Sequence, residues 1–293
     1  MSMRAVRIHG FGGPEVMRVD ELPLPEPGPG EVLVRLAAAS VNPIDWKMRE
    51  GLLKGPLPRV LGRDGAGCDA ASGERLLGIG SRGRDGTHAQ YAVFERAMTA
   101  AVPPSMSLDA AAAIGIAALS AWIPLVEDAR LAPGQRVLVH AGAGGVGGYA
   151  LQLARSYGAE AWTTCSARNA EFCRGLGAHR TIDYTREDFR DAGRVFDVVL
   201  DTVGGEIHAR SAEVLRPGGV LAYLSAAPVQ RPGRSDILVI PAQIQATRER
   251  LERLLAAGLR APIEARFPLE RAAEAYELSR SGHARGKIVL DIS

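Results

Sequence analysis

Residues 136–154 read Arg136-Val-Leu-Val-His-Ala-Gly-Ala-Gly-Gly-Val-Gly-Gly-Tyr-Ala-Leu-Gln-Leu-Ala154. A short apolar run ends in glycines, and the apolar periodicity of a helix follows over Val146 to Ser156. A glycine cluster alone more often marks a plain turn. Here a strand at Val137 to Val139 precedes it, and a second is expected at Glu160 to Thr164. The stretch therefore predicts a βαβ unit whose backbone N–H groups and helix N-terminus bind a dinucleotide pyrophosphate.

The end of the second predicted strand indicates which nucleotide binds. An NAD-binding unit usually carries an acidic residue there to hold the ribose 2′-hydroxyl. This chain reads Thr163-Thr-Cys-Ser-Ala-Arg-Asn169 and has no carboxylate in that run. Ser166 and Arg168 suit a 2′-phosphate through charge-assisted hydrogen bonds, which favours NADP over NAD. The alternative is that Ser166 caps the next helix and Arg168 is solvated; capping is compatible with phosphate binding.

Composition bounds the class of protein. The 293 residues suit two modest domains, and 46% hydrophobic with 23% charged residues is ordinary for a globular protein. A formal net charge of +2, with scattered basic residues, argues against nucleic-acid binding. The start of the chain lacks the apolar core of a signal peptide, so we expect a cytoplasmic location. The alanine-rich run from Ala110 to Val126 is interpreted as a buried helix rather than a membrane span.

The rhythm of the chain changes near Arg136. Residues 1 to about 100 have strand character between Gly/Pro-rich breaks, which suggests a small irregular β-barrel. From Arg136, strands and helices alternate, which predicts a doubly wound parallel sheet and an α/β fold. Strands are expected at 137–140, 161–164, 180–183, 195–203, 220–224 and, at the sheet edge, 237–240. Helices are expected at 146–156, 169–176, 187–192, 206–215 and 242–257, and strand 263–267, helix 269–279 and strand 287–292 follow.

Several motifs together resemble the zinc-independent branch of the medium-chain dehydrogenase/reductase superfamily, the quinone oxidoreductase and enone (alkenal) reductase group. They are Ser40-Val-Asn-Pro-Ile-Asp-Trp-Lys47, Gly62-Arg-Asp-Gly-Ala-Gly67, Gly86-Thr-His-Ala-Gln-Tyr91, Ala141-Gly-Ala-Gly-Gly-Val-Gly147, Asp197-Val-Val-Leu-Asp-Thr-Val-Gly-Gly205, Leu215-Arg-Pro-Gly-Gly219 and Gly282-His-Ala-Arg-Gly-Lys-Ile-Val-Leu290. The resemblance implies a GroES-like β-barrel domain from residues 1–117 and 242–293, with a Rossmann NADP-binding domain at 118–241. It further implies that a cleft between the domains holds NADPH and a small-molecule substrate.

Zinc-dependent relatives bind a catalytic metal with a Cys and a His-Glu pair. In this chain Asp45 and the Gly62-Arg63-Asp64 triplet occupy the corresponding stretches. Without thiolate and imidazole ligands suitably placed, no metal site is expected. A carbonyl acceptor would then be activated by hydrogen bonds.

Asn42 and Lys47 are the catalytic candidates implied by the resemblance. The Asn42 amide would lie near the nicotinamide, holding the cofactor or donating to a substrate carbonyl. An ammonium at Lys47 would stabilise the enolate that forms when hydride reaches the β-carbon, and would supply a proton. The alternative is a surface Lys47 paired with Glu50 or Asp45. Asp45 itself is expected to cap or orient a short helix that starts near Trp46.

Other cofactor-binding residues are also implied by the resemblance. They are Ser120, Gly144, Gly145, Val146, Gly147, Tyr184, Gly205, Ser225, Arg285 and Lys287. An exposed turn position is an equally good interpretation of Arg285 and Lys287. Relatives use a segment near Pro228 to Ser235 for a dimer edge, and this segment is shortened here. A homodimer is therefore an open expectation.

These observations predict an NADPH-dependent reductase of quinones or of activated C=C bonds in α,β-unsaturated carbonyls. An NADPH-binding sensor or structural protein with little turnover is the alternative from a different class. An enoyl-thioester reductase is a third alternative, disfavoured because a tyrosine is missing from the Asn42 segment.

Overall fold

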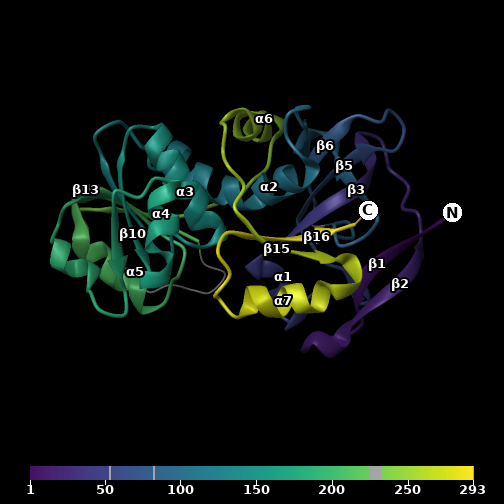
Figure 1. Cartoon of the computed structure of the whole chain (residues 1–293), viewed down its shortest axis with the longest axis horizontal. Helices are drawn as coiled ribbons and strands as arrows, with labels where there is room; N and C mark the ends of the chain where they lie inside the picture. The colour runs from purple at the N-terminus through teal and green to yellow at the C-terminus, as the bar shows by residue number, and fades with distance from the viewer. Residues whose placement is uncertain (53, 82, 225–231, 293) are drawn as a thin grey trace. The chain divides into compact units, whose positions relative to one another are not determined.

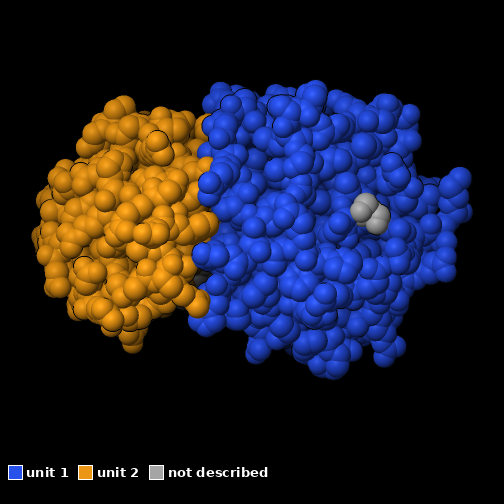
Figure 2. Space-filling model, in the orientation of Figure 1, with its two compact units in different colours: residues 1–116, 246–293 blue, residues 117–245 orange. Residues whose placement is uncertain are grey.

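The computed structural model describes residues 1–52, 54–81, 83–224 and 232–292. The chain divides into two compact units, which Figure 2 shows in different colours. One unit comprises Met1–Ile116 together with Ala246–Ser293, and the other comprises Ala117–Gln245. Both ends of the chain therefore belong to the same unit.

The unit of residues 117–245 is built on a parallel sheet of six strands, in the order β11-β10-β9-β12-β13-β14. Its strands are β9 (Arg136–Val139), β10 (Glu160–Cys165), β11 (Arg180–Asp183), β12 (Phe196–Asp201), β13 (Leu215–Tyr223) and β14 (Leu238–Pro241). Helices α3 (Gly145–Ser156), α4 (Ala170–Leu176) and α5 (Glu206–Ser211) alternate with them (Figure 1). The predicted α/β fold with a Rossmann-type parallel sheet is confirmed.

Three predicted helices are wrong in extent. The expected helix 187–192 is only a 3₁₀ turn, Phe189–Ala192. The expected helix 206–215 ends at Ser211, because a 3₁₀ turn follows and strand β13 begins at Leu215. Helix α6 runs over Arg248–Ala256, starting six residues after the predicted Ala242, because Thr247 Oγ1 accepts the Arg250 N–H at 3.3 Å and so caps its N-terminus.

The unit formed by both chain ends contains a sheet of order β15-β16-β3-β5-β6-β8, with β7 paired to β3. Its strands are β3 (Glu31–Val41), β5 (Asp64–Asp69), β6 (Arg75–Ile79), β7 (Tyr91–Glu95), β8 (Thr99–Ala101), β15 (Ile263–Pro268) and β16 (Lys287–Asp291). A smaller sheet joins β1 (Ser2–Ile8), β2 (Met17–Pro23) and β4 (Arg59–Val60). Strand β16 runs antiparallel to β3, pairing Ile288 with Val41. This pairing brings the last strand beside the start of helix α1 (Pro43–Arg49).

Helix α2 (Leu108–Trp122) departs from helical geometry at Gly115, where φ is −6° and ψ is −116°. The stretch Leu108–Asp128 is long and apolar enough to cross a membrane, and 78% of its most apolar window is buried. Burial of that kind is typical of a core helix.

Candidate active site and nucleotide-binding turn

Asn42 follows strand β3 and precedes helix α1, and its side chain is almost completely buried. Its Nδ2 donates to Asp64 Oδ1 at 2.8 Å and to Ser40 Oγ at 3.2 Å. Its Oδ1 accepts a hydrogen bond from Lys287 Nζ at 2.6 Å. The amide is therefore held in one orientation, with its N–H groups committed to the protein and one oxygen lone pair remaining.

Asp64 connects this network to helix α2. Its Oδ1 accepts from Ser40 Oγ at 2.6 Å, and its Oδ2 accepts from the Ile116 N–H at 2.7 Å. The break at Gly115 frees that N–H, and a Cβ at Gly115 would lie 2.2 Å from Asp64 Oδ2. From the sequence, Asp64 is recognisable only as part of the triplet that occupies a zinc-ligand stretch. Its contact with the Ile116 N–H beside Gly115 could not be predicted, because no local pattern relates these positions.

Lys287 is buried at the first position of β16, which rules out the exposed-turn alternative for this residue. Its Nζ donates to Val41 O at 3.3 Å as well as to Asn42 Oδ1. Burial lowers the pKa of Lys287, while the Asp64 and Asp45 carboxylates oppose that shift. Arg285, by contrast, is exposed and forms an ion pair with Glu264 at 3.3 Å.

Asp45 lies in the first turn of α1 and is fully buried. Its Oδ2 accepts the Asn42 N–H at 2.8 Å, so the helix begins at Pro43 and not near Trp46 as expected. Burial raises the pKa of Asp45 to about 7, against the opposing effect of that hydrogen bond. Among the described residues Asp45 Oδ1 has no partner.

Lys47 is half-buried on the same helix, with its Nζ 5.5 Å from the centre of the Trp46 ring. The alternative pairing with Glu50 or Asp45 is not seen, since Glu50 contacts Arg49 and Arg280 instead. In the described parts of the chain Lys47 is not hydrogen-bonded to Asn42. Its catalytic role therefore stays a prediction.

His88 and Tyr276 connect to the same network through the backbone of Ser40. The His88 Nε2 lies 3.2 Å from the carbonyl of Ser40, which can only accept, so Nε2 carries the proton. Its Nδ1 then accepts from the Tyr276 hydroxyl at 2.8 Å. Burial lowers the pKa of His88 to about 4 and raises that of Tyr276. The pair is neutral and buried, which fits a structural role.

The glycine-rich turn lies between β9 and α3. Gly144 is the N-cap residue of α3, and the turn includes Gly145, Val146 and Gly147. A Cβ at Gly147 would lie 2.3 Å from Ala141 O, and one at Gly142 would lie 2.1 Å from Thr163 Oγ1. At these two positions only glycine fits, as expected for a backbone turn that closes around phosphate.

Ser166 and Arg168 follow strand β10 as predicted. Ser166 precedes the 3₁₀ turn Ala167–Asn169, and its Oγ accepts from Asn169 Nδ2 at 3.2 Å. Arg168 is exposed and, within the described ranges, forms no ion pair. Asp183, the acidic residue at the end of neighbouring strand β11, accepts from the Thr185 N–H and Oγ1 at 3.1 and 2.8 Å. The acid is thereby engaged in its own turn.

The remaining predicted cofactor residues have varied surroundings. Tyr184 is 63% exposed just beyond β11, and Ser120 is buried within α2. Gly205 has a φ of 60° and is the N-cap residue of α5. Ser225 lies outside the described residues. Nothing in the structure tests their predicted contacts with a cofactor.

The described residues contain no group of three or more His, Cys, Asp or Glu side chains arranged to hold a metal ion. In particular, both carboxylates of the Asn42 network already accept hydrogen bonds from protein groups.

Comparison with known proteins places these features in context. The sequence pattern of the family described as zinc-binding dehydrogenase matches residues 176–290, and that of the alcohol dehydrogenase GroES-like domain matches residues 28–82. The quinone-oxidoreductase homolog of Spinacia oleracea chloroplasts is 30% identical, over 99% of this chain and 98% of that protein. The chloroplastic NADPH-dependent alkenal/one oxidoreductase of Arabidopsis thaliana is 30% identical, over 98% of this chain and 79% of that protein.

A similar solved structure is that of Escherichia coli quinone oxidoreductase complexed with NADPH. It has a TM-score of 0.89 and 26% identity, and the match covers 98% of this chain and 99% of that one.

Proposed function

The chain belongs to the medium-chain dehydrogenase/reductase superfamily, in the group of quinone oxidoreductases and alkenal/one oxidoreductases, and from this premise we propose that it is an NADPH-dependent reductase. The substrates we propose are quinones or the activated C=C bonds of α,β-unsaturated carbonyls, reduced without zinc. The observation that carries the choice of coenzyme is the end of strand β10, where Ser166 and the exposed Arg168 stand in place of an acidic residue; Arg168 forms no ion pair with any residue that the structure describes.

The residues present fit this coenzyme. The closed turn at Gly144, Gly145 and Gly147 offers backbone N–H groups to a pyrophosphate at the N-terminus of α3. Ser166 and Arg168 would hold the 2′-phosphate through charge-assisted hydrogen bonds. When bound, the dihydronicotinamide supplies a hydride.

Asn42 and Lys47 take different roles in this proposal. Both N–H groups of the Asn42 amide are donated to Ser40 and Asp64, so Asn42 retains only a carbonyl lone pair for a bound molecule. We therefore assign Asn42 to holding the nicotinamide end rather than to donating to the acceptor. Lys47 would stabilise the negative charge that develops on the acceptor oxygen and would return a proton.

Function without zinc is supported by the donor set. The zinc-dependent relatives use thiolate and imidazole ligands, whereas this chain has Asp45 and Asp64, both hydrogen-bonded within the protein.

The test follows NADPH absorbance with an ortho-quinone, a short-chain enone and an enoyl thioester. We expect turnover with the quinone or the enone, and a kcat about 100-fold lower in Lys47→Ala. Lys54→Ala, an exposed lysine a few residues further on, is the matched control and should behave as wild type.

The outcomes separate the alternatives. NADPH binding without oxidation by any acceptor would favour a sensor or structural protein. Turnover confined to the thioester would identify an enoyl-thioester reductase. Full activity in Lys47→Ala would remove the proton-donor role while leaving the reductase assignment intact.

A further inference from the structure

A buried hydrogen-bond chain runs beneath the glycine-rich turn. His140, the residue after strand β9, is 1% exposed. Its Nδ1 lies 3.1 Å from Thr164 Oγ1, and its Nε2 lies 3.0 Å from Ser211 Oγ on helix α5. The N–H of Ala141 donates to the same Thr164 Oγ1 at 3.1 Å. One imidazole and two hydroxyls therefore join two strand ends and a helix.

The direction of each of these hydrogen bonds can be worked out starting from Ser211. Ser211 Oγ donates to the carbonyl of Ile207 at 2.6 Å, so it accepts from a proton on His140 Nε2. His140 Nδ1 then carries a lone pair and accepts the Thr164 hydroxyl proton. Thr164 Oγ1 has lone pairs left for the Ala141 N–H. With His140 neutral and protonated on Nε2, each of these hydrogen bonds has one donor and one acceptor, so a single tautomer accounts for all of them.

The surroundings keep His140 neutral and fixed. Burial lowers its pKa to about 4; Asp201 opposes that shift and Arg210 adds to it. The Phe189 ring packs edge-on against the imidazole, with 4.8 Å between the ring centres. The guanidinium carbon of Arg210 lies 5.3 Å from the centre of the Phe189 ring.

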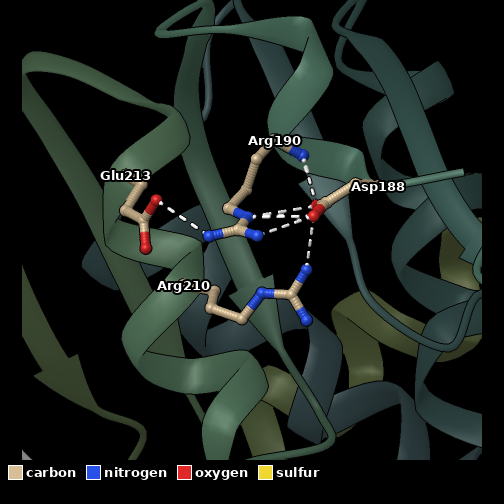
Figure 3. A network of polar contacts seen from close by, with 4 residues as sticks. All are labelled: Asp188, Arg190, Arg210 and Glu213. Carbon is tan, nitrogen blue, oxygen red and sulfur yellow. Dashed lines mark hydrogen bonds and ion pairs between the residues drawn. The ribbon is translucent and has the colours of Figure 1, made fainter.

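The segment that carries Phe189 is itself clamped by charges. Figure 3 shows the Asp188 carboxylate in contact with two guanidinium groups, those of Arg190 and Arg210. The N–O distances are 2.8 Å to Arg190 and 2.7 Å to Arg210. Arg190 also reaches Glu213 at 3.4 Å. Because Arg210 is on helix α5, this network fixes the 3₁₀ turn to that helix.

These hydrogen bonds stabilise an unfavourable backbone conformation at Ala141. Ala141 has a φ of 55°, a left-handed conformation that residues with a Cβ rarely adopt. Two hydrogen bonds donated to Thr164 fix it: Oγ1 accepts the Ala141 N–H, and the carbonyl accepts the Gly142 N–H at 3.2 Å. Thr164 lies two residues before Ser166, so the same residue fixes the phosphate turn and the strand end that carries the predicted 2′-phosphate site.

We propose that His140 and Thr164 are positioning residues for the coenzyme, which set the phosphate turn against the end of β10 without touching the coenzyme themselves. The inference rests on the proposed function. It can be tested separately, because the pyrophosphate is common to NADH and NADPH. Loss of the hydrogen bonds of Thr164 or His140 should therefore weaken the binding of both coenzymes, whereas loss of Arg168 should weaken the binding of NADPH alone.

The test measures dissociation constants for NADPH and NADH by calorimetry, without an acceptor. Thr164→Val keeps the shape of the side chain but removes its hydroxyl, and it should weaken both coenzymes about tenfold. Thr164→Ser restores the hydroxyl and should recover most of the affinity. Thr181→Val, on the neighbouring strand β11, is the matched control and should bind as wild type.

Ser211→Ala provides a second, milder disruption, because it removes the acceptor of the His140 Nε2 proton and the hydrogen bond to the Ile207 carbonyl but leaves Thr164 intact. It should weaken both coenzymes by about threefold, and it keeps the proposal testable if Thr164→Val fails to fold. Wild-type affinity for both coenzymes in folded Thr164→Val or in Ser211→Ala would overturn the proposal, as would a loss confined to NADPH. A wild-type chain that binds neither coenzyme would refute the proposed function itself.

Discussion

Lys287 Nζ donates a 2.6 Å hydrogen bond to Asn42 Oδ1, across 245 positions of the sequence. The antiparallel pairing of β16 with β3 makes this contact possible. The buried ammonium lies near the carboxylates of Asp45 and Asp64, which partly compensate its desolvation. The contact fixes the amide of the residue that we assign to the nicotinamide end.

Replacing Lys287 should cost stability. Lys287→Met removes a hydrogen bond from a charged donor and leaves Asn42 Oδ1 unsatisfied, which we expect to lower the free energy of unfolding by about 2 kcal/mol. Urea denaturation measures this directly. Arg285→Met is the control, since the Arg285 side chain is exposed and its ion pair with Glu264 lies at the surface, so stability should change by less than about 1 kcal/mol. Equal effects of the two substitutions would contradict a buried structural contact.

Asp45 should make stability depend on pH. Its folded pKa of about 7 lies above the ordinary value of 3.8, so between these pH values the folded state holds a proton that the unfolded chain has released. This contribution stabilises the fold at low pH, relative to neutral pH, and is lost as the pH rises through about 7.

Asp45→Asn removes that titration but keeps an acceptor for the Asn42 N–H. The unfolding free energy of the variant minus that of the wild type should therefore rise by about 4 kcal/mol between pH 4 and 8. His88 and His140 titrate in both proteins, so their effects cancel in the difference. A difference that is flat across this range would show that Asp45 ionises normally.

Arg168 should discriminate between coenzymes. Arg168→Ala removes the proposed contact with the 2′-phosphate, so the KM for NADPH should rise about 10- to 100-fold while that for NADH stays nearly constant. Arg174→Ala, an exposed arginine on helix α4, serves as the matched control. Similar changes for NADPH and NADH in Arg168→Ala would refute the 2′-phosphate assignment.

Two glycine-to-alanine substitutions should differ in outcome: one should weaken coenzyme binding, and the other should increase stability. Gly147→Ala places a Cβ 2.3 Å from the carbonyl oxygen of Ala141, so the phosphate turn must open and coenzyme binding should fall at least tenfold. Gly175→Ala, in helix α4, meets no atom within 4 Å and should raise the unfolding free energy by up to about 1 kcal/mol. Thermal unfolding and a coenzyme titration on both variants check the pair. Unchanged coenzyme binding in Gly147→Ala would contradict the proposal that this turn binds the pyrophosphate.

Local sequence patterns predicted much of this protein. The apolar runs predicted the strands of the parallel sheet, and the Arg180–Asp183 strand has the predicted bounds. The glycine cluster after Val139 predicted the turn and the helix that follows, since backbone closure depends on neighbouring residues. The missing acid after β10 indicated the coenzyme, because that position is fixed by its distance from the glycines.

Only the tertiary structure decided the chemistry around Asn42. The ammonium that orients the Asn42 amide comes from Lys287, and the backbone N–H that binds Asp64 is freed by the kink at Gly115. Neither partner is marked by local periodicity, because sheet pairing and helix packing bring distant residues together without leaving a pattern in the sequence. Burial, which raises the pKa of Asp45 and lowers that of Lys287, likewise depends on the whole folded unit.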